Sequence, residues 1–346
     1  MMKMKDINNK LENTCNLKND RNLYENFERM WQKHWFQYIL DNPDKKWYYN
    51  FLMNNPNINW EIIKANTNKP WDYKYLSDNS NITWEFVKAN QYVDLSNINQ
   101  LNPKDSIPWD YDRLSRNPNI TWEIVQANPN KPWDYEYLSG NPNITWEIVQ
   151  ANPNKPWDYE YLSFNPNITL EIVQSNPNKY WDYEYLSENS NITWEIVKAN
   201  PNEDWNYDYL SQNPNITWEI VQANQDKPWS YFNLSQNPNI TWEIVQANRD
   251  KPWDYDCLSI NPNITWEIVQ ANPNIDWDYE WLSLNTMTKA KNDFIRNKFR
   301  EHFAREGIKE EMIAKIMNPK FLGKTAYEQV ERLKQLGFDE ESDEDE

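Results

Sequence analysis

The sequence repeats itself every 24 residues over most of its length, and this period constrains the fold more than any other feature. One tryptophan lies in each copy of a motif close to TWEIV, with leucine in one copy, and another begins each copy of a motif close to WDYEYLS. The first series is Trp60, Trp84, Trp122, Trp146, Leu170, Trp194, Trp218, Trp242 and Trp266, and the second is Trp47, Trp71, Trp109, Trp133, Trp157, Trp181, Trp205, Trp229, Trp253 and Trp277. Each series has a single step of 38, which locates a 14-residue insertion within 91–107. Such a period is typical of a solenoid, in which stacked repeats share one core.

Each repeat has two similar halves, NPNITWEIVQA and NPNKPWDYEYLSG, and each half predicts a short helix. Asn-Pro favours turns, because Pro fixes φ and Asn side chains bond nearby backbone amides. Thr145 or Asn143 can cap the first helix, and Pro156 suits the first turn of the second. We expect Glu147 and Asp158 in first turns, where the helix dipole favours acids. Strands are disfavoured because the apolar residues of WEIVQAN have helical spacing and the chain contains only 4 glycines.

Helices of about two turns need neighbours to be stable, since isolated helices shorter than roughly 12–15 residues are marginal in water. We expect the large apolar side chains of each repeat to bury against the same positions 24 residues away, each contributing roughly 1.5–3 kcal/mol. In one repeat these are Trp146, Ile148, Val149, Trp157, Tyr161 and Leu162. The predicted fold class is all-α: an α-solenoid of about ten 24-residue units, each with two short helices.

The ends of the array are expected to be helical caps. Residues 1–32 contain an amphipathic helix, and the drifted first repeat has Phe36 and Trp47 at the marker positions. The repeats would fill residues 33–285 and form a rod or superhelix on the order of 80–100 Å long, whose curvature the sequence does not predict. Residues 286–338 predict further amphipathic helices, with 12 Lys or Arg against 7 Asp or Glu, and residues 339–346 are an acidic tail.

Composition argues against several partners. The formal net charge of −18 disfavours binding to nucleic acid and to anionic membrane surfaces. No run approaches the roughly 18 apolar residues of a membrane span, and no secretory signal is recognisable. The two cysteines, Cys15 and Cys257, lie far apart without zinc-site spacing, which fits a reducing compartment. We therefore expect a soluble intracellular protein.

Catalytic groups are scarce, so we expect no enzymatic activity, no cofactor and no metal site. The only histidines, His34 and His302, lie outside the repeats. Cys257 takes the place of a repeated tyrosine and is interpreted as a packing variant. The paired carboxylates of the array are the only abundant groups for acid–base chemistry.

Carboxylates recur in register along the array and are candidate partner-facing residues: Asp134, Glu136, Asp158, Glu160, Asp182 and Glu184. A cation-binding stripe is one interpretation, but calcium sites need six or more converging oxygens and usually a glycine turn. A solvated acidic face is favoured, and such a face steers basic partners. Partner specificity is expected at the position that varies between repeats, namely Gly140, Phe164, Glu188, Gln212, Gln236 and Ile260.

Three further patterns have a structural and a functional interpretation. The triplet Asn-Ile-Thr, beginning at Asn81, has the form of an N-glycosylation acceptor, but a turn followed by a helix cap explains it. Tyrosines such as Tyr135, Tyr159 and Tyr183 would form a platform for glycans or bases if they face outward, and otherwise belong to the core. Ser342 in ESDEDE suits an acid-directed kinase, or is an incidental residue of a solvated tail.

The unit NPNKPWDYEYLSGNPNITWEIV resembles leucine-rich variant repeats, which also have 24 residues, Asn/Asp-Pro turns and two short helical segments. Their leucines are mostly Trp and Tyr here. The chain is more similar to tandem-repeat proteins of amoeba-infecting giant viruses of the mimivirus kind, which carry the same unit and a helical tail with a turn like Asn318–Lys320. This resemblance spans nearly the whole chain. It implies a viral origin, a location in the host cytoplasm or the virion, and a fold, but no function.

The function expected from these observations is that of a non-enzymatic repeat scaffold that mediates protein–protein interaction. The partner is unknown, and the acidic face favours a basic one. One alternative is a structural or virion-associated rod that self-assembles. Another is a glycan-binding aromatic array.

Overall fold

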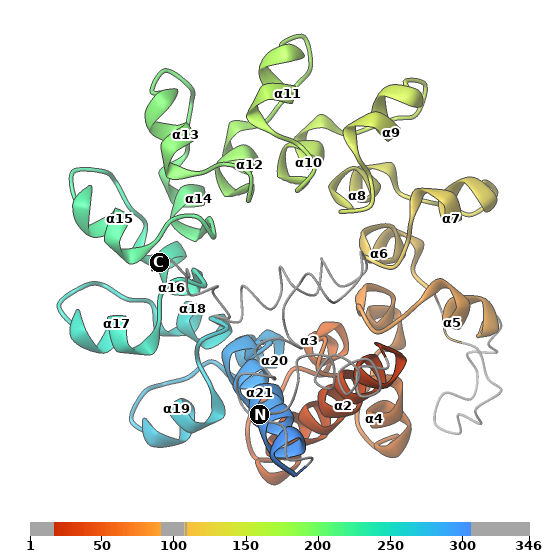
Figure 1. Ribbon diagram of the computed structural model, residues 1–346, viewed down its shortest axis with the longest axis vertical. Coiled ribbons are helices and arrows are strands. Elements are labelled where there is room, and N and C mark those ends of the chain that lie inside the picture. The colour runs from red at the N-terminus through yellow and green to blue at the C-terminus, as the bar shows by residue number, and fades with distance from the viewer. Residues whose placement is uncertain (1–16, 91–106, 108, 306–346) are drawn as a thin grey trace, which may run out of the picture. The chain divides into compact units, whose positions relative to one another are not determined.

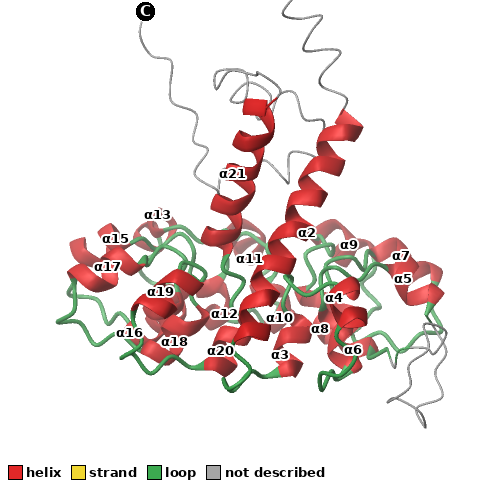
Figure 2. Ribbon diagram, turned by 90° about the horizontal axis from the view of Figure 1, so that it is seen from below, coloured by secondary structure: helices red, strands yellow, loops and turns green. Residues whose placement is uncertain are grey.

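The computed structural model describes residues 17–90, 107 and 109–305. Its described part consists of helices and connecting loops and contains no strand (Figure 2). It divides into two compact parts, of which one spans Tyr38–Thr286 and the other combines the segments before Tyr38 and after Thr286. The predicted all-α repeat fold is confirmed.

Each repeat folds as two short helices, one on the outside and one on the inside of a ring (Figure 1). The outer helices are α4 (Trp60–Ala65), α5 (Trp84–Ala89), α7 (Trp122–Ala127), α9 (Trp146–Ala151), α11 (Leu170–Ser175), α13 (Trp194–Ala199), α15 (Trp218–Ala223), α17 (Trp242–Ala247) and α19 (Trp266–Ala271). The inner helices are α3 (Tyr49–Asn54), the 3-10 helix η1 (Tyr73–Asp78), α6 (Tyr111–Arg116), α8 (Tyr135–Gly140), α10 (Tyr159–Phe164), α12 (Tyr183–Glu188), α14 (Tyr207–Gln212), α16 (Tyr231–Gln236), α18 (Tyr255–Ile260) and α20 (Tyr279–Leu284). We number the repeats 1 to 10 by these inner helices.

Repeats 1 and 3 differ from this pattern, but each still has two halves that contact each other. In repeat 1 the last turn of α2 (Leu17–Asp41) takes the place of an outer helix. Trp47 Nε1 donates to the carbonyl of Asn42, just after this turn, at 2.8 Å, and the equivalent tryptophans bond in the same way to the residue after their outer helices. Repeat 3 contains the insertion, of which residues 91–106 and 108 lie outside the described part. Its two halves still meet, since Trp109 Nε1 donates to Asn90 O at 2.9 Å.

Side chains just before each helix fix where it begins. Thr145 is the N-cap of α9, and its Oγ1 accepts a hydrogen bond from Ile148 N at 3.4 Å, as predicted. Asp158 is the N-cap of α10 and accepts from Tyr161 N at 3.0 Å. The prediction that Asp158 and Pro156 lie in a first turn is therefore wrong. The inner helix begins at the tyrosine after the aspartate, because the aspartate side chain satisfies an amide that has no partner within the helix.

Asparagine side chains connect each repeat to the one before it. Asn189 is buried, and its Nδ2 donates to Ser163 O at 2.8 Å, to Asn165 O at 2.9 Å and to Ile168 O at 3.3 Å. Its Oδ1 accepts from Asn191 N at 2.8 Å. The equivalent buried residues are Asn55, Asn79, Asn117, Asn141, Asn165, Asn213, Asn237, Asn261 and Asn285. This asparagine ladder satisfies backbone carbonyls at the junctions that would otherwise be buried without partners.

Tryptophans pack between neighbouring repeats, but not on their own counterparts. The ring of Trp146 lies 5.8 Å from that of Trp181, which belongs to the second series of the following repeat. The expected packing on the same position 24 residues away is therefore wrong for this residue. Trp157 Nε1 donates to Asn152 O at the end of α9, which holds the second-series ring against the outer helix. Of the predicted core, Val149, Trp157 and Leu162 are buried, and Trp146, Ile148 and Tyr161 are half-buried.

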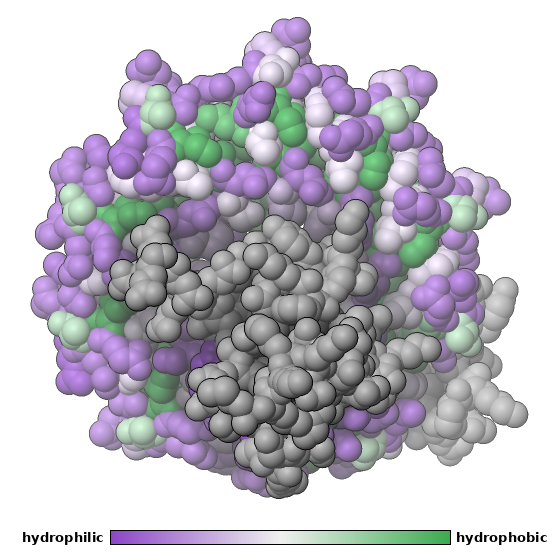
Figure 3. Space-filling model, viewed as in Figure 1, coloured by the Kyte–Doolittle hydropathy of each residue, from purple (hydrophilic) through white to green (hydrophobic). Residues whose placement is uncertain are grey.

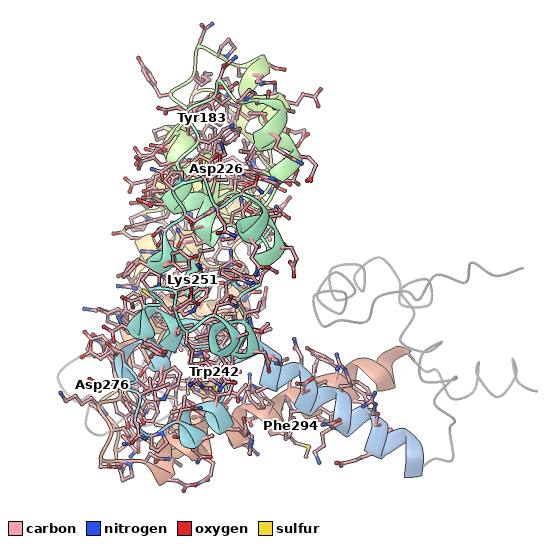
Figure 4. The ribbon with its side chains drawn as sticks, turned by 90° about the vertical axis from the view of Figure 1, so that its left-hand side faces the viewer. Tyr183, Asp226, Trp242, Lys251, Asp276 and Phe294 are labelled. Carbon is pink, nitrogen blue, oxygen red and sulfur yellow. The ribbon has the colours of Figure 1, made fainter. Side chains whose placement is uncertain are left out.

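The resulting core lies between the two circles of helices. On the face drawn in Figure 3, hydrophobic residues gather in a band between the outer and inner helices, and hydrophilic residues cover the outer rim. The turns between the two helices of repeats 8, 9 and 10, which contain Asp226, Lys251 and Asp276, follow one another along the wall of the ring (Figure 4). Each layer thus buries its apolar face against the next.

Repeat 10 contacts repeat 1, so the array closes on itself (Figure 1). Tyr48 N donates to Ser283 Oγ at 3.0 Å, which matches the bond from Asp182 N to Ser163 Oγ at 2.9 Å within the array. Asn55 Nδ2 donates to the carbonyls of Ser283 and Asn285, both at 3.0 Å, as the asparagine ladder does elsewhere. The seam between repeats 10 and 1 therefore uses the same hydrogen bonds as an internal junction.

Aromatic contacts repeat at the seam as well. The rings of Trp266 and Trp47 are 5.7 Å apart, as in the other tryptophan pairs. Tyr38 adds a parallel stack on Trp266 at 4.2 Å, and burial together with the neighbouring Tyr279 raises the pKa of Tyr38 to about 12. The sequence predicts a rod or superhelix without giving its curvature, and the contacts at the seam show that the repeat part closes into a ring. Ten repeats that each turn the chain by about 36° complete a circle and leave no end face to cap.

The second part is an antiparallel pair of helices, formed by α2 up to Gln37 and α21 (Thr288–Arg305). Phe27 lies edge-on to Phe299 with 5.0 Å between ring centroids, and Trp31 lies 5.7 Å from Phe294. Both histidines belong to this pair. The remaining predicted C-terminal helices, the acidic tail and Ser342 lie outside the described residues. None of the described helices combines the length and apolar character that a membrane crossing requires.

Candidate functional site

The inner helices have one face that packs on no other helix among the residues that the structure describes. In α8, Leu138 is fully buried, and helical geometry places Glu136 and Gly140 on the opposite side, with Tyr137 beside them. Because the inner helices surround the centre of the ring (Figure 1), this side faces inward. We call the surface formed by the second, third and sixth residues of the inner helices the inner face.

Exposed carboxylates occupy the second position of most inner helices. They are Asp112, Glu136, Glu160, Glu184, Asp208, Asp256 and Glu280. The six acids predicted as partner-facing therefore separate into two groups. Glu136, Glu160 and Glu184 belong to the inner face and are exposed.

The other three predicted acids have a structural role. Asp134, Asp158 and Asp182 are half-buried N-caps whose side chains accept backbone hydrogen bonds. A helix boundary separates them from the glutamates, because each aspartate precedes its helix and each glutamate is the second residue of that helix. The side chains of these aspartates therefore already accept hydrogen bonds from the helices that follow them.

Tyrosines at the third position form a ladder along the inner face. The ring centroids of Tyr137 and Tyr161 are 5.7 Å apart, those of Tyr161 and Tyr185 6.2 Å, and those of Tyr185 and Tyr209 6.0 Å. Sequence reasoning missed this ladder and considered the first-position tyrosines instead. Those pack on the following repeat, as Tyr135 does on Trp157 at 5.4 Å.

Three inner-face tyrosines, Tyr161, Tyr185 and Tyr209, lie close to the second-position carboxylate of the preceding repeat. Burial, a hydrogen bond from its hydroxyl to Glu136 and the charge of Glu136 together raise the pKa of Tyr161 to about 12. Burial and the charge of Glu160 likewise raise the pKa of Tyr185. Carboxylates and aromatic rings therefore alternate around this part of the ring.

Two arginines show how a cation fits this surface. The Arg113 side chain pairs with Asp78, and its guanidinium lies 4.0 Å from the centre of the Tyr75 ring. The guanidinium of Arg116 lies 4.0 Å from the centre of the Tyr137 ring. Both arginines belong to repeat 3, so the chain supplies its own cations to the inner-face tyrosines of repeats 2 and 4.

The positions predicted to carry specificity are the sixth residues of the inner helices and belong to the inner face. Phe164 is 45 % exposed there, which is unusual for a large apolar side chain. Burial raises the pKa of the Glu188 carboxyl. At Gly140 an added Cβ would meet the Tyr161 ring at 3.7 Å, an ordinary contact. Side chains of different size and charge therefore fit at this position.

The remaining candidate sites have structural explanations. Asn143 Nδ2 donates to Pro118 O at 2.7 Å and to Ile120 O at 3.0 Å, so a glycan on this nitrogen would disrupt the junction. Cys257 is buried, and burial and Asp254 raise its thiol pKa to about 12, which disfavours the thiolate. Within the described part of the chain, no group of His, Cys, Asp or Glu side chains is arranged to hold a metal ion.

No known protein family, curated protein or solved structure matches this chain. We therefore infer the function from the residues of the inner face.

Proposed function

We propose that this protein is a non-enzymatic scaffold, a ring of repeats that binds another protein on its inner face. One observation carries the proposal: within the described part of the chain, carboxylates that are exposed to solvent alternate with tyrosines on a continuous surface of the inner helices. Extended surfaces of this kind are what repeat proteins use for binding. The excess of carboxylates supports a basic partner.

The alternatives have less support. For the structural alternative, the seam between repeats 10 and 1 occupies both end faces of the array, so an assembly would have to pack through the lateral surfaces of the ring. A glycan-binding array would use the first-position tyrosines, which pack against tryptophans of the next repeat. The viral origin, with a place in the host cytoplasm or the virion, remains a proposal from the resemblance of the repeat unit.

The proposal is tested by affinity purification with three forms of the full chain. The first is the native sequence, the second carries Glu136→Gln, Glu160→Gln and Glu184→Gln, and the third carries Glu61→Gln, Glu171→Gln and Glu267→Gln in the outer helices. Both variants remove three exposed carboxylates, so they match in net charge. We expect proteins that the native and outer variants recover but the inner variant loses. Identical recovery by all three forms would contradict the proposal.

A further inference from the structure

We infer that the inner face of repeats 4 to 7 binds an extended peptide segment with arginine at every second residue. This inference rests on the proposed function and names the chemistry of the partner. Three observations carry it: the chain's own arginines on the neighbouring repeats, the absence of basic side chains from the inner face of repeats 5 to 7, and the spacing of the tyrosine ladder.

The first observation is the internal example at repeats 2 to 4. Arg113 contacts an aromatic face and a carboxylate of the preceding repeat at once, through Tyr75 and Asp78. Arg116 lies on Tyr137, the first ring of the ladder. A guanidinium stacks on aromatic faces and pairs with carboxylates because it is planar and always charged. Tyr185 and Glu188 occupy the positions of Tyr75 and Asp78 in repeat 6, where no arginine of the following inner helix contacts them.

The second observation is that repeats 5 to 7 offer these contacts without a cation of their own. Their inner-face residues are Glu160, Tyr161, Phe164, Glu184, Tyr185, Glu188, Asp208, Tyr209 and Gln212. None of these residues is basic, and the second-position carboxylates are exposed. The exposed ring of Phe164 adds an apolar surface for the methylene groups of an arginine. The charge of this face therefore selects a basic occupant.

The third observation is the spacing of the rings. Neighbouring ladder tyrosines are 5.7, 6.2 and 6.0 Å apart. Alternate residues are about 6.6 Å apart along a β-strand, and their side chains lie on the same side. An extended chain along the ladder thus advances about two residues per repeat. Alternate side chains point to one side, so every second residue meets a new tyrosine and carboxylate.

The experiment measures the dissociation constants of short fluorescent peptides from the full-length protein by anisotropy. One peptide alternates four arginines with four serines, and a second has the same composition with the arginines in one block. We expect the alternating peptide to bind at least about fivefold more tightly, because only its spacing brings each guanidinium to one repeat. A lysine version of the alternating peptide is expected to bind more weakly, since an ammonium does not stack as a planar group.

Variants locate the binding surface. Glu160→Gln with Glu184→Gln is expected to weaken binding of the alternating peptide by about tenfold, and Tyr185→Leu by about threefold. Glu171→Gln with Glu267→Gln, in the outer helices, is expected to leave it unchanged. Helical circular dichroism equal to that of the native protein confirms that each variant is folded.

Each other outcome overturns the inference. Equal affinity for the alternating and block peptides contradicts the spacing, and an unchanged affinity of the inner variants places any binding elsewhere. If neither peptide binds while the affinity purification still yields partners that depend on Glu136, Glu160 and Glu184, the scaffold function stands and the arginine segment is wrong.

Discussion

Replacing Asn189 with alanine is expected to lower the free energy of unfolding by at least about 3 kcal/mol. The substitution leaves the carbonyls of Ser163, Asn165 and Ile168 with one donor fewer and the amide of Asn191 without its acceptor, all at a buried junction. Each buried polar group left without a partner costs about 1–3 kcal/mol. Urea denaturation followed by circular dichroism measures the change.

Two further substitutions separate this effect from a general loss of side-chain volume. Asn189→Asp keeps the shape and the acceptor oxygen but lacks the amide donors, so we expect it to destabilise the protein at least as much as alanine at pH 7. Asn178→Ala changes an exposed asparagine in a turn and is expected to stay within about 0.5 kcal/mol of the native protein. A loss below about 1 kcal/mol for Asn189→Ala would show that the asparagine ladder does not hold the junctions together.

Replacing Trp218 with alanine is expected to cost about 3–5 kcal/mol, the range for truncating a large aromatic side chain in a core. Trp218 is 6 % exposed, and its ring centroid lies 5.5 Å from that of Trp253 in the next repeat. The cavity would therefore open between two layers. Thermal or urea denaturation measures this loss.

Leucine at the same position is a natural control, because Leu170 fills it in repeat 6 and is itself buried. We expect Trp218→Leu to cost clearly less than Trp218→Ala. A double-mutant cycle between Trp218 and Trp253 is expected to show a coupling energy of about 0.5–1.5 kcal/mol. The coupling energy between Trp218 and Trp181 is expected to lie within the experimental error. Equal coupling in both cycles would contradict the observed pairing of tryptophans between neighbouring repeats.

The short helices can be predicted from the sequence because each depends on residues within or next to it. The 24-residue period, the N-cap role of Thr145 and the helical spacing in WEIVQA predict α9 correctly. The start of the second helix of the repeat is predicted too early, because Pro156 and Asp158 also suit the first turn of a helix. This shift changes which tyrosine of the repeat is expected to face inward. Tyrosine stands at the first position of all ten inner helices, as at Tyr135, but at the third position of only five, as at Tyr137, and its presence alone does not distinguish the ladder from the core.

Closure of the ring is a property of the whole array and has no local signal. It depends on the sum of ten small rotations, each fixed by side-chain packing at a junction. The asparagines were interpreted as turn formers, whereas Asn189 also donates to the repeat before it. The drift of repeat 1 suggested a cap. In the ring, Tyr38 stands where most repeats have isoleucine, such as Ile62 or Ile148, and its stack on Trp266 contributes to the seam.

The closed seam is tested most directly by comparing two distances in solution. Spin labels introduced as unnatural amino acids at Lys46 and Glu280 span the seam, and labels at Tyr180 and Glu160 occupy the equivalent exposed positions of repeats 6 and 5. The ring predicts the same distance distribution for both pairs in pulsed electron paramagnetic resonance. An open array of ten layers would instead place Lys46 and Glu280 on the order of 80 Å apart while Tyr180 and Glu160 stay close together. That result would contradict the closed ring.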